Sequence, residues 1–91
     1  MNTDCSMIIT LTGRVQGVGF RYHARHLAQE LGLVGYIKNQ PDESVLIVIQ
    51  GSPDLVRAFL EWCKQGPPRA IVESMNITDH PISTYSAFKI C

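Results

Sequence analysis

The chain has 91 residues, of which 45% are hydrophobic and 18% charged, and its formal net charge is zero. These values predict one folded domain over residues 1–91 and exclude a disordered chain, and the neutral charge argues against a protein that holds nucleic acid through its overall field. The longest aliphatic run, Val45 to Ile49, is too short to span a membrane, and Asp4 precedes the first apolar run, where a secretory signal carries basic residues. We therefore expect a cytoplasmic protein.

Strand and helix patterns alternate along the chain. Two stretches have apolar residues at helical spacing: one runs from Phe20 to Gly32, whose glycine is placed to end the helix, and the other begins at Ser52 as N-cap, with Pro53 as the first helical residue. The turn Pro41-Asp42-Glu43 predicts a hairpin. Short runs rich in apolar and β-branched residues predict strands at 7–12, 33–39, 44–50, 70–78 and 86–90.

The order of these segments is βαββαβ followed by a terminal strand. It predicts an α+β fold, a ferredoxin-like sandwich in which two helices cover one face of a four-stranded antiparallel sheet and a short extra C-terminal strand follows. Alternate residues of the third strand, from Val45 to Ile49, are expected to face the helices. Leu46 and Val48 then form an apolar patch on the outer face with Ile8, which predicts weak self-association of an otherwise monomeric chain.

A glycine-rich segment joins the first strand to the first helix. It reads Gly13-Arg14-Val15-Gln16-Gly17-Val18-Gly19-Phe20-Arg21. Gly17 and Gly19 are able to adopt backbone angles that direct successive N–H groups at one point. The helix start adds unpaired N–H groups and the positive end of its dipole, and Arg21 adds a two-pronged cation that fits phosphate oxygens. The segment therefore predicts a site for a phosphate-like anion.

The charged residues are unevenly distributed. Between Gly13 and Lys38 four basic residues stand against one acidic residue, a net charge of +3, whereas the chain from Asn39 onward has a net charge of −2. A cation in the first turn of a helix, such as Arg21, is unfavourable unless an anion lies near it. Both observations favour a small anionic ligand near the glycine-rich segment.

Neither the cysteines nor the histidines have the spacing of a metal site. Cys5, Cys63 and Cys91 are odd in number and far apart, which argues against a disulfide framework and against zinc. Reduced thiols are expected, with a Cys5–Cys91 bridge between the chain ends as the alternative. His23 and His26 lie three residues apart on the polar side of the first helix and lack a third ligand. We expect no bound metal.

Over nearly its whole length the chain resembles the small acylphosphatases. The segment from Gly13 to Arg21 is similar to the first signature of that family, with every defining position present, and the segment from Gly32 to Gly51 is similar to the second. Two residues depart from the second signature: Ile37 stands where a smaller residue is usual, and Glu43 stands where the family has a hairpin glycine. If the hairpin keeps a bulged turn, Glu43 has a positive φ and is strained.

The resemblance implies hydrolysis of the carboxyl–phosphate bond of acyl phosphates, with inorganic phosphate as a product and no cofactor. It assigns positioning of the attacking water to Asn39, which ends a strand parallel to the first and so comes near the glycine-rich segment. The chemistry of this reaction is consistent with a site that has no general acid or base. A carboxylate leaves without protonation, and a loose phosphoryl-transfer transition state needs little help from a base. Phosphate binding is assigned to Val15, Gln16, Gly17, Val18, Gly19, Phe20 and Arg21.

Other functions compete with this one. Similar domains begin larger hydrogenase-maturation proteins that process carbamoyl phosphate, but Tyr22 stands where those domains commonly have proline, so a free-standing hydrolase is favoured. Ferredoxin-like sheets also include RNA-recognition domains, which stack bases on aromatic residues of the central strands. The strands at 7–12 and 44–50 contain no aromatic residue, which argues against a nucleic-acid partner. A ligand-regulated interaction domain is the third alternative.

Overall fold

The computed structural model describes residues 3–91. Within this part of the chain, five strands and two helices follow in the predicted order, and each strand begins and ends within two residues of its predicted limits. Ser52 is the N-cap of the second helix by position, but its side chain forms no capping hydrogen bond. The elements are β1 (Cys5–Arg14), α1 (Phe20–Glu30), β2 (Val34–Asn39), β3 (Val45–Gly51), α2 (Pro53–Cys63), β4 (Ile71–Asp79) and β5 (Phe88–Ile90).

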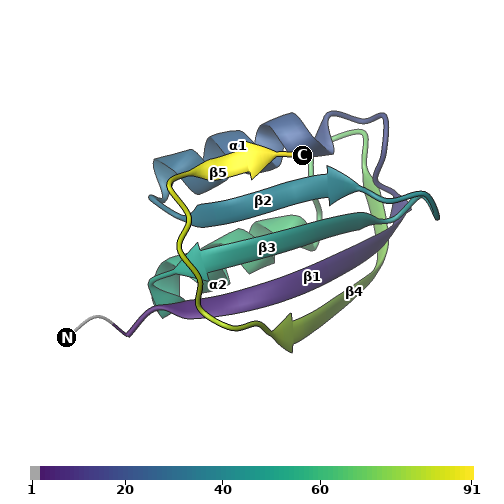
Figure 1. The fold of residues 1–91 in the computed structure, drawn as a ribbon. Coiled ribbons are helices and arrows are strands. Elements are labelled where there is room, and N and C mark those ends of the chain that lie inside the picture. Colours follow the sequence, from purple (N-terminus) through teal and green to yellow (C-terminus); the bar gives the residue numbers. More distant parts are fainter. Residues whose placement is uncertain (1–2) are drawn as a thin grey trace.

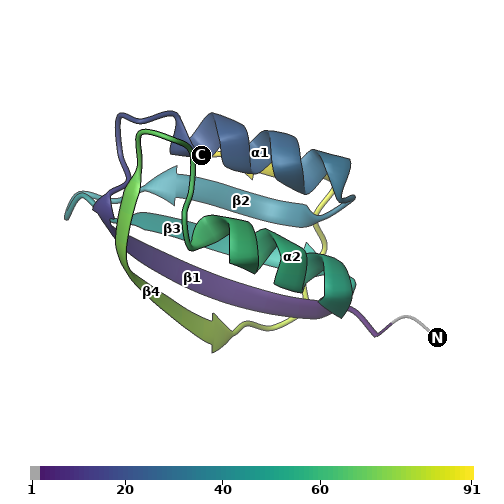
Figure 2. The same cartoon turned by 180° about the vertical axis from the view of Figure 1, so that it is seen from behind.

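The strands form one sheet in the order β4-β1-β3-β2-β5. β1 and β2 are both antiparallel to β3, which lies between them, and β4 is antiparallel to β1. β5 runs parallel to β2, so the complete sheet is mixed. Both helices cover the same face, which is in front in Figure 2 and behind in Figure 1. The ferredoxin-like sandwich is confirmed, and β1 and β2 run parallel to each other as the topology requires.

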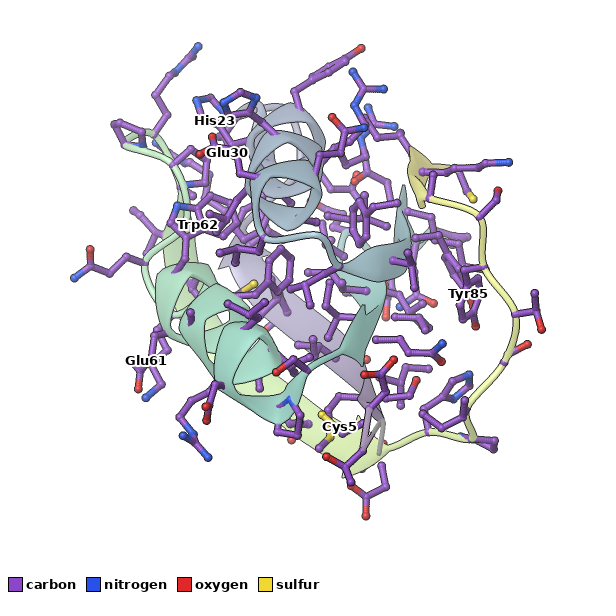
Figure 3. All side chains as sticks on the ribbon, turned by 90° about the vertical axis from the view of Figure 1, so that its left-hand side faces the viewer. Cys5, His23, Glu30, Glu61, Trp62 and Tyr85 are labelled. Atoms are coloured by element: carbon purple, nitrogen blue, oxygen red, sulfur yellow. The ribbon has the colours of Figure 1, made fainter. Side chains whose placement is uncertain are left out.

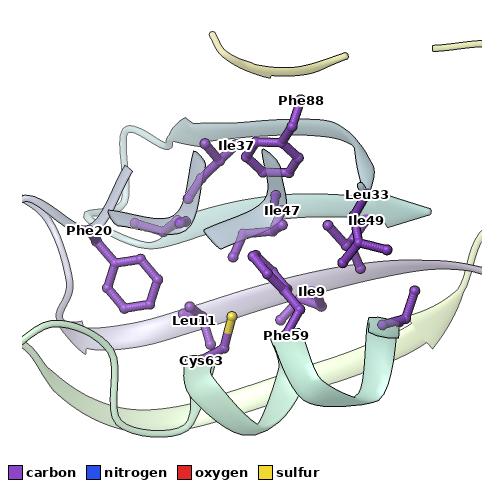
Figure 4. Close-up of a cluster of buried hydrophobic side chains, with 14 of the residues drawn as sticks. Ile9, Leu11, Phe20, Leu33, Ile37, Ile47, Ile49, Phe59, Cys63 and Phe88 are labelled. Carbon is purple, nitrogen blue, oxygen red and sulfur yellow. The ribbon is translucent and has the colours of Figure 1, made fainter. Parts of the chain in front are cut away.

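The hydrophobic core lies between the helices and the sheet (Figure 4). Ile37 of β2 is fully buried in this core, so its larger side chain is accommodated. Trp62 packs edge-on against Phe20 with the ring centroids 5.2 Å apart, which supports a packing role for this tryptophan. Other buried side chains come from every central element: Ile9, Leu11, Ala24, Ile47, Ile49 and Phe59.

The outer face of the sheet differs from the prediction. Val48 was expected to be exposed there, yet it is fully buried. The segment between β4 and β5 crosses this face (Figure 1), and Tyr85 of that segment lies near Tyr36 of β2, with ring centroids 6.3 Å apart (Figure 3). Gln50 holds the segment: its Nε2 donates to the Ser83 carbonyl at 2.7 Å, and its Oε1 accepts the Ser83 N–H at 3.0 Å. Val48 is therefore not part of an exposed patch, whereas Leu46 and Ile8 are half-buried, and weak self-association stays a prediction.

The cysteines within residues 3–91 are free thiols. Cys5 begins β1, whereas Cys91 follows β5, which is three positions away from β1 in the sheet. Since adjacent strands lie about 4.8 Å apart, the two residues are farther apart than the roughly 7 Å that a disulfide allows between Cα atoms. The alternative of a Cys5–Cys91 bridge is therefore wrong for this fold. Cys63 lies in the core, where burial raises the pKa of its thiol far above the usual range.

The hairpin between β2 and β3 contains a strained residue. Glu43 has a φ of 74° and is the one non-glycine residue of residues 3–91 with a positive φ, which confirms the prediction for this turn. The Asp42 carboxylate accepts hydrogen bonds from the Ser44 N–H at 3.0 Å and the Ser44 hydroxyl at 2.5 Å. The bonds from Ser44 lower the pKa of Asp42. Backbone bonds from Gln40 to Ser44 and from Glu43 to Gln40 close the turn.

Candidate functional site

The glycine-rich segment forms a loop between the end of β1 and the start of α1 (Figure 1). Gly17 and Gly19 have φ values of 73° and 80°, in the left-handed region that glycine adopts without strain. Within residues 3–91 the N–H groups of residues 16–20 donate to no other backbone group. Gly19 is the N-cap of α1, and the first turn of this helix carries no acidic side chain. Free N–H donors thus gather at the positive end of a helix, an arrangement that binds anions.

Two side chains anchor this loop. Gln16 donates from Nε2 to the carbonyl of Gln40 at 2.8 Å and to the carbonyl of Ser44 at 2.9 Å, so it ties the loop to the β2–β3 hairpin. The Nδ1 atom of His23 lies 2.8 Å from the Gly19 carbonyl oxygen, which also accepts the His23 backbone N–H at 3.1 Å. Because a carbonyl is only an acceptor, Nδ1 carries the hydrogen in this pair. These hydrogen bonds attach the loop to the hairpin through Gln16 and to the first turn of α1 through the Gly19 carbonyl.

A pocket of about 140 Å³ opens between the loop, the first turn of α1 and the end of β2. It brings Arg21 and Asn39 together with four of the six predicted loop residues. Gln16 and Val18 do not line it, because the Gln16 side chain is bound to the hairpin and Val18 packs against the core. The residues that line the pocket are Val15, Gly17, Gly19, Phe20, Arg21, Tyr22 and Asn39.

Arg21 supplies the charge in the pocket wall. It is half-buried in the first turn of α1, and no acidic side chain of residues 3–91 forms an ion pair with it. The ion pairs of the described chain lie on α2, at Asp54 and Glu61, and Glu30 contacts His26 on α1; these side chains are all exposed. The charge of Arg21 is therefore available to a ligand. No group of three or more His, Cys, Asp or Glu residues is placed to hold a metal ion in this part of the chain.

Asn39 reaches the pocket from a different element. It pairs with Val45 of β3, and Val45 also pairs with Leu11 of β1, so the end of β2 lies level with Leu11, close to the end of β1 from which the loop starts. The Oδ1 atom of Asn39 is buried and has no hydrogen-bond partner within residues 3–91. Buried polar atoms without a partner are uncommon. A water molecule or ligand group in the pocket would satisfy this acceptor.

Two features of the site were not predicted. Tyr22 lines the pocket, and the available signal was its position directly after Arg21 in the first turn of the helix. The anchoring of the loop by Gln16 spans 24 residues to Gln40 and 28 residues to Ser44, and no local pattern reports such distant contacts. Tyr22 therefore was within reach of sequence reasoning, whereas the role of Gln16 as an anchor was not.

Comparisons with known proteins identify the family and support the fold. A family model described as Acylphosphatase matches residues 7–90. A Nocardioides protein named Acylphosphatase is 46% identical over 71 residues, which cover 78% of this chain and 72% of that protein. The structure of an acylphosphatase from Coxiella burnetii gives a TM-score of 0.93 at 36% identity and covers 99% of this chain and 94% of that one. A full-length HypF, in a phosphate- and nucleotide-bound form, gives 0.92 at 27% identity, and the match covers all of this chain and 12% of that one.

Proposed function

This chain belongs to the acylphosphatase family, and we propose that it hydrolyses its substrate by direct attack of water on a phosphoryl group held by the 15–20 loop and Arg21. The protein is an enzyme that cleaves acyl phosphates to a carboxylate and inorganic phosphate. The roles of individual residues are our proposal. The observation that carries it is one pocket in which the free loop N–H groups, Arg21 and Asn39 meet.

The loop and Arg21 bind the phosphoryl group. The N–H groups of residues 15–20 donate to its oxygens, and Gly17 and Gly19 supply the backbone angles that such a cradle needs. The guanidinium of Arg21 offers two parallel donors and a full positive charge to the same oxygens. Charge on these oxygens is spread in the transition state, and donors already in place stabilise it without reorganisation. These groups supply the positive potential themselves, so we propose a reaction that needs neither a metal nor a cofactor.

Asn39 positions the attacking water. Its Oδ1 accepts one water hydrogen, which aligns an oxygen lone pair with the phosphorus atom. The water attacks phosphorus, the bond from phosphorus to the acyl oxygen breaks, and the electron pair leaves with the carboxylate. The carboxylate is a stable anion, so it needs no general acid, and the water loses its proton to solvent or phosphate oxygen late in the reaction. No covalent enzyme intermediate is formed.

We further propose that the enzyme acts as a monomer in the cytoplasm and binds no nucleic acid. Free thiols at Cys5, Cys63 and Cys91 favour a reducing compartment. The segment that holds Tyr85 crosses the face of the sheet on which RNA-recognition domains of this fold stack bases. A sheet face occupied by the chain itself offers little platform for such stacking.

A pair of substitutions tests the proposed roles. Arg21→Lys replaces a planar fork by a single ammonium, so it should raise the inhibition constant of inorganic phosphate and also lower kcat. Asn39→Ala should leave the phosphate inhibition constant within a few-fold and lower kcat by roughly 100-fold or more, the scale of one lost preorganised polar group. Turnover would be measured on acetyl and benzoyl phosphate, with circular dichroism to show that each variant is folded.

Matched controls separate site effects from general ones. Arg57→Lys changes an exposed arginine of α2, and Asn76→Ala changes an exposed asparagine of β4; both should keep wild-type kinetics. If Asn39→Ala weakens phosphate binding as severely as Arg21→Lys, Asn39 belongs to the phosphate cradle and does not position water. If neither variant alters kinetics, the pocket is not the active site.

A further inference from the structure

Tyr22 is an exposed aromatic residue at the edge of the pocket. It follows Arg21 in the first turn of α1, lines the same pocket, and is 62% exposed. The guanidinium of Arg25, one turn along the helix, lies 5.6 Å from the centre of the Tyr22 ring. A cation at this distance from a ring face attracts it and limits its motion. Burial does not explain the position of this large side chain, so contact with a ligand is the alternative to consider.

The lining of the pocket determines where the acyl group lies. The groups proposed to hold phosphate and water line this pocket of about 140 Å³, so the phosphoryl group and the attacking water lie inside it. The inner wall consists of backbone and of the buried side chains Val15 and Phe20. The acyl part of the substrate therefore projects out of the mouth, where Gly17 and Tyr22 are the exposed lining residues and Tyr22 is the one with a side chain.

The surface continues beyond Tyr22 into a second, shallower depression. It measures about 260 Å³ and is lined by Tyr22, His23 and His26. Tyr22 is thus shared by the two hollows, and a group that leaves the phosphate pocket on this side passes along its ring. This shallow surface offers a benzoyl ring the Tyr22 side chain to pack against, whereas the methyl group of acetyl phosphate covers little of it.

We propose that Tyr22 packs against the acyl group of the substrate and sets the preference for flat, apolar acyl groups over small ones. The inference rests on the proposed function, because it places the phosphoryl group in the loop. Tyr22 takes no part in bond breaking. Offset or edge-on contact between two rings is worth roughly a factor of five to ten beyond simple burial. The residue therefore changes the ratio of specificities between two acyl phosphates and leaves the phosphoryl chemistry alone.

The test compares benzoyl phosphate with acetyl phosphate. In Tyr22→Ala the ratio of kcat/KM for benzoyl over acetyl phosphate should fall about five- to tenfold, mainly through KM for benzoyl phosphate. Tyr22→Phe retains the ring and should keep the wild-type ratio. The inhibition constant of inorganic phosphate, which has no acyl group, should be unchanged in both variants. Gln29→Ala, at an exposed position in the last turn of α1, is the control and should change none of these values.

The possible outcomes separate this inference from the proposed function. An unchanged ratio in Tyr22→Ala, with activity on both substrates retained, overturns the role of Tyr22 alone. A large loss of phosphate binding in Tyr22→Ala also overturns it, because Tyr22 would then belong to the phosphate cradle. A wild-type protein inactive on both acyl phosphates overturns the proposed function and this inference with it.

Discussion

Replacement of Glu43 by glycine is expected to stabilise the protein. Glu43 has a φ of 74°, where Cβ approaches the backbone and a residue other than glycine loses about 1–2 kcal/mol. The side chain is exposed and, within residues 3–91, forms no hydrogen bond or ion pair. The backbone N–H of Glu43 donates to the Gln40 carbonyl at 3.1 Å, and glycine retains this bond. The substitution therefore removes strain and no native contact.

The size of the effect follows from two opposing terms. Glycine makes the unfolded chain more flexible, which lowers the free energy of unfolding by about 0.4–1 kcal/mol. Relief of the strain exceeds this loss and leaves a net gain of about 1 kcal/mol. For a domain of this length, 1 kcal/mol raises Tm by roughly 4–8 °C.

Thermal and urea unfolding, followed by circular dichroism, would measure this gain. Glu43→Ala is the matched control, because it removes the same charge and side chain but keeps the Cβ atom that causes the strain. Its Tm should stay near that of the wild type. A glycine variant with an equal or lower Tm would refute the strain argument, and so would an alanine variant that gains as much as the glycine variant.

Further predictions concern metals, pH, the thiols and the loop anchor. Because the loop and Arg21 supply the positive charge, a strong chelator should leave hydrolysis unchanged; lost activity that magnesium or zinc restores would contradict this. The hydrogen bonds from Ser44 lower the pKa of Asp42 in the folded protein, so they contribute stability above the unfolded value of about 3.9 that is lost as the pH falls through the folded value. Urea unfolding between pH 2 and 7 should show a smaller loss of stability at acid pH in Asp42→Asn than in the wild type, and equal losses would count against it. Burial raises the pKa of the Cys63 thiol, so in a variant with Cys5→Ser and Cys91→Ser an aromatic disulfide reagent should label Cys63 only after unfolding; rapid labelling of this variant in its native state would exclude the buried placement. Gln16→Ala removes two hydrogen bonds to the hairpin and should cost about 1–2 kcal/mol in urea unfolding and lower kcat, whereas an unaltered kcat would show that the anchor does not position the site.

The order of helices and strands was predictable because it depends on local properties of the chain. The helical spacing that starts at Phe20 and the glycine at position 32 define α1 without reference to distant residues. The path of the segment before β5 was not predictable in this way. It depends on the hydrogen bonds between Gln50 and Ser83, which are 33 residues apart and leave no periodic pattern. The burial of Val48 is the consequence, since strand alternation reports which face a side chain points to and not what covers that face.

The candidate site was predictable where a backbone requirement is visible in the residue type. Glycines at positions 17 and 19 indicate left-handed backbone angles, and the structure shows them. The approach of Asn39 to the loop required one further step, the parallel arrangement of β1 and β2 that the fold imposes. Tyr22 gave a weaker signal, its position directly after Arg21, because an exposed aromatic residue on a helix is common and acquires a meaning only when a pocket is seen beside it.

Gln16 ties the candidate site to the hairpin that contains Glu43, yet we expect substitution of Glu43 to change stability and not activity. The loop and Asn39 belong to different segments, so their relative position depends on contacts between those segments. Gln16 provides them by donating to the carbonyls of Gln40 and Ser44, the two residues that bracket the turn. Catalysis by positioning is sensitive to displacements of about 1 Å, so we expect substitution of Gln16 to lower kcat. Glu43 lies between the bracketing residues, but the turn is also closed by the bond from Gln40 to Ser44 and by the Asp42 carboxylate. Glycine at position 43 therefore should raise Tm and leave kcat unchanged, because the conformation it relaxes is already determined by its neighbours.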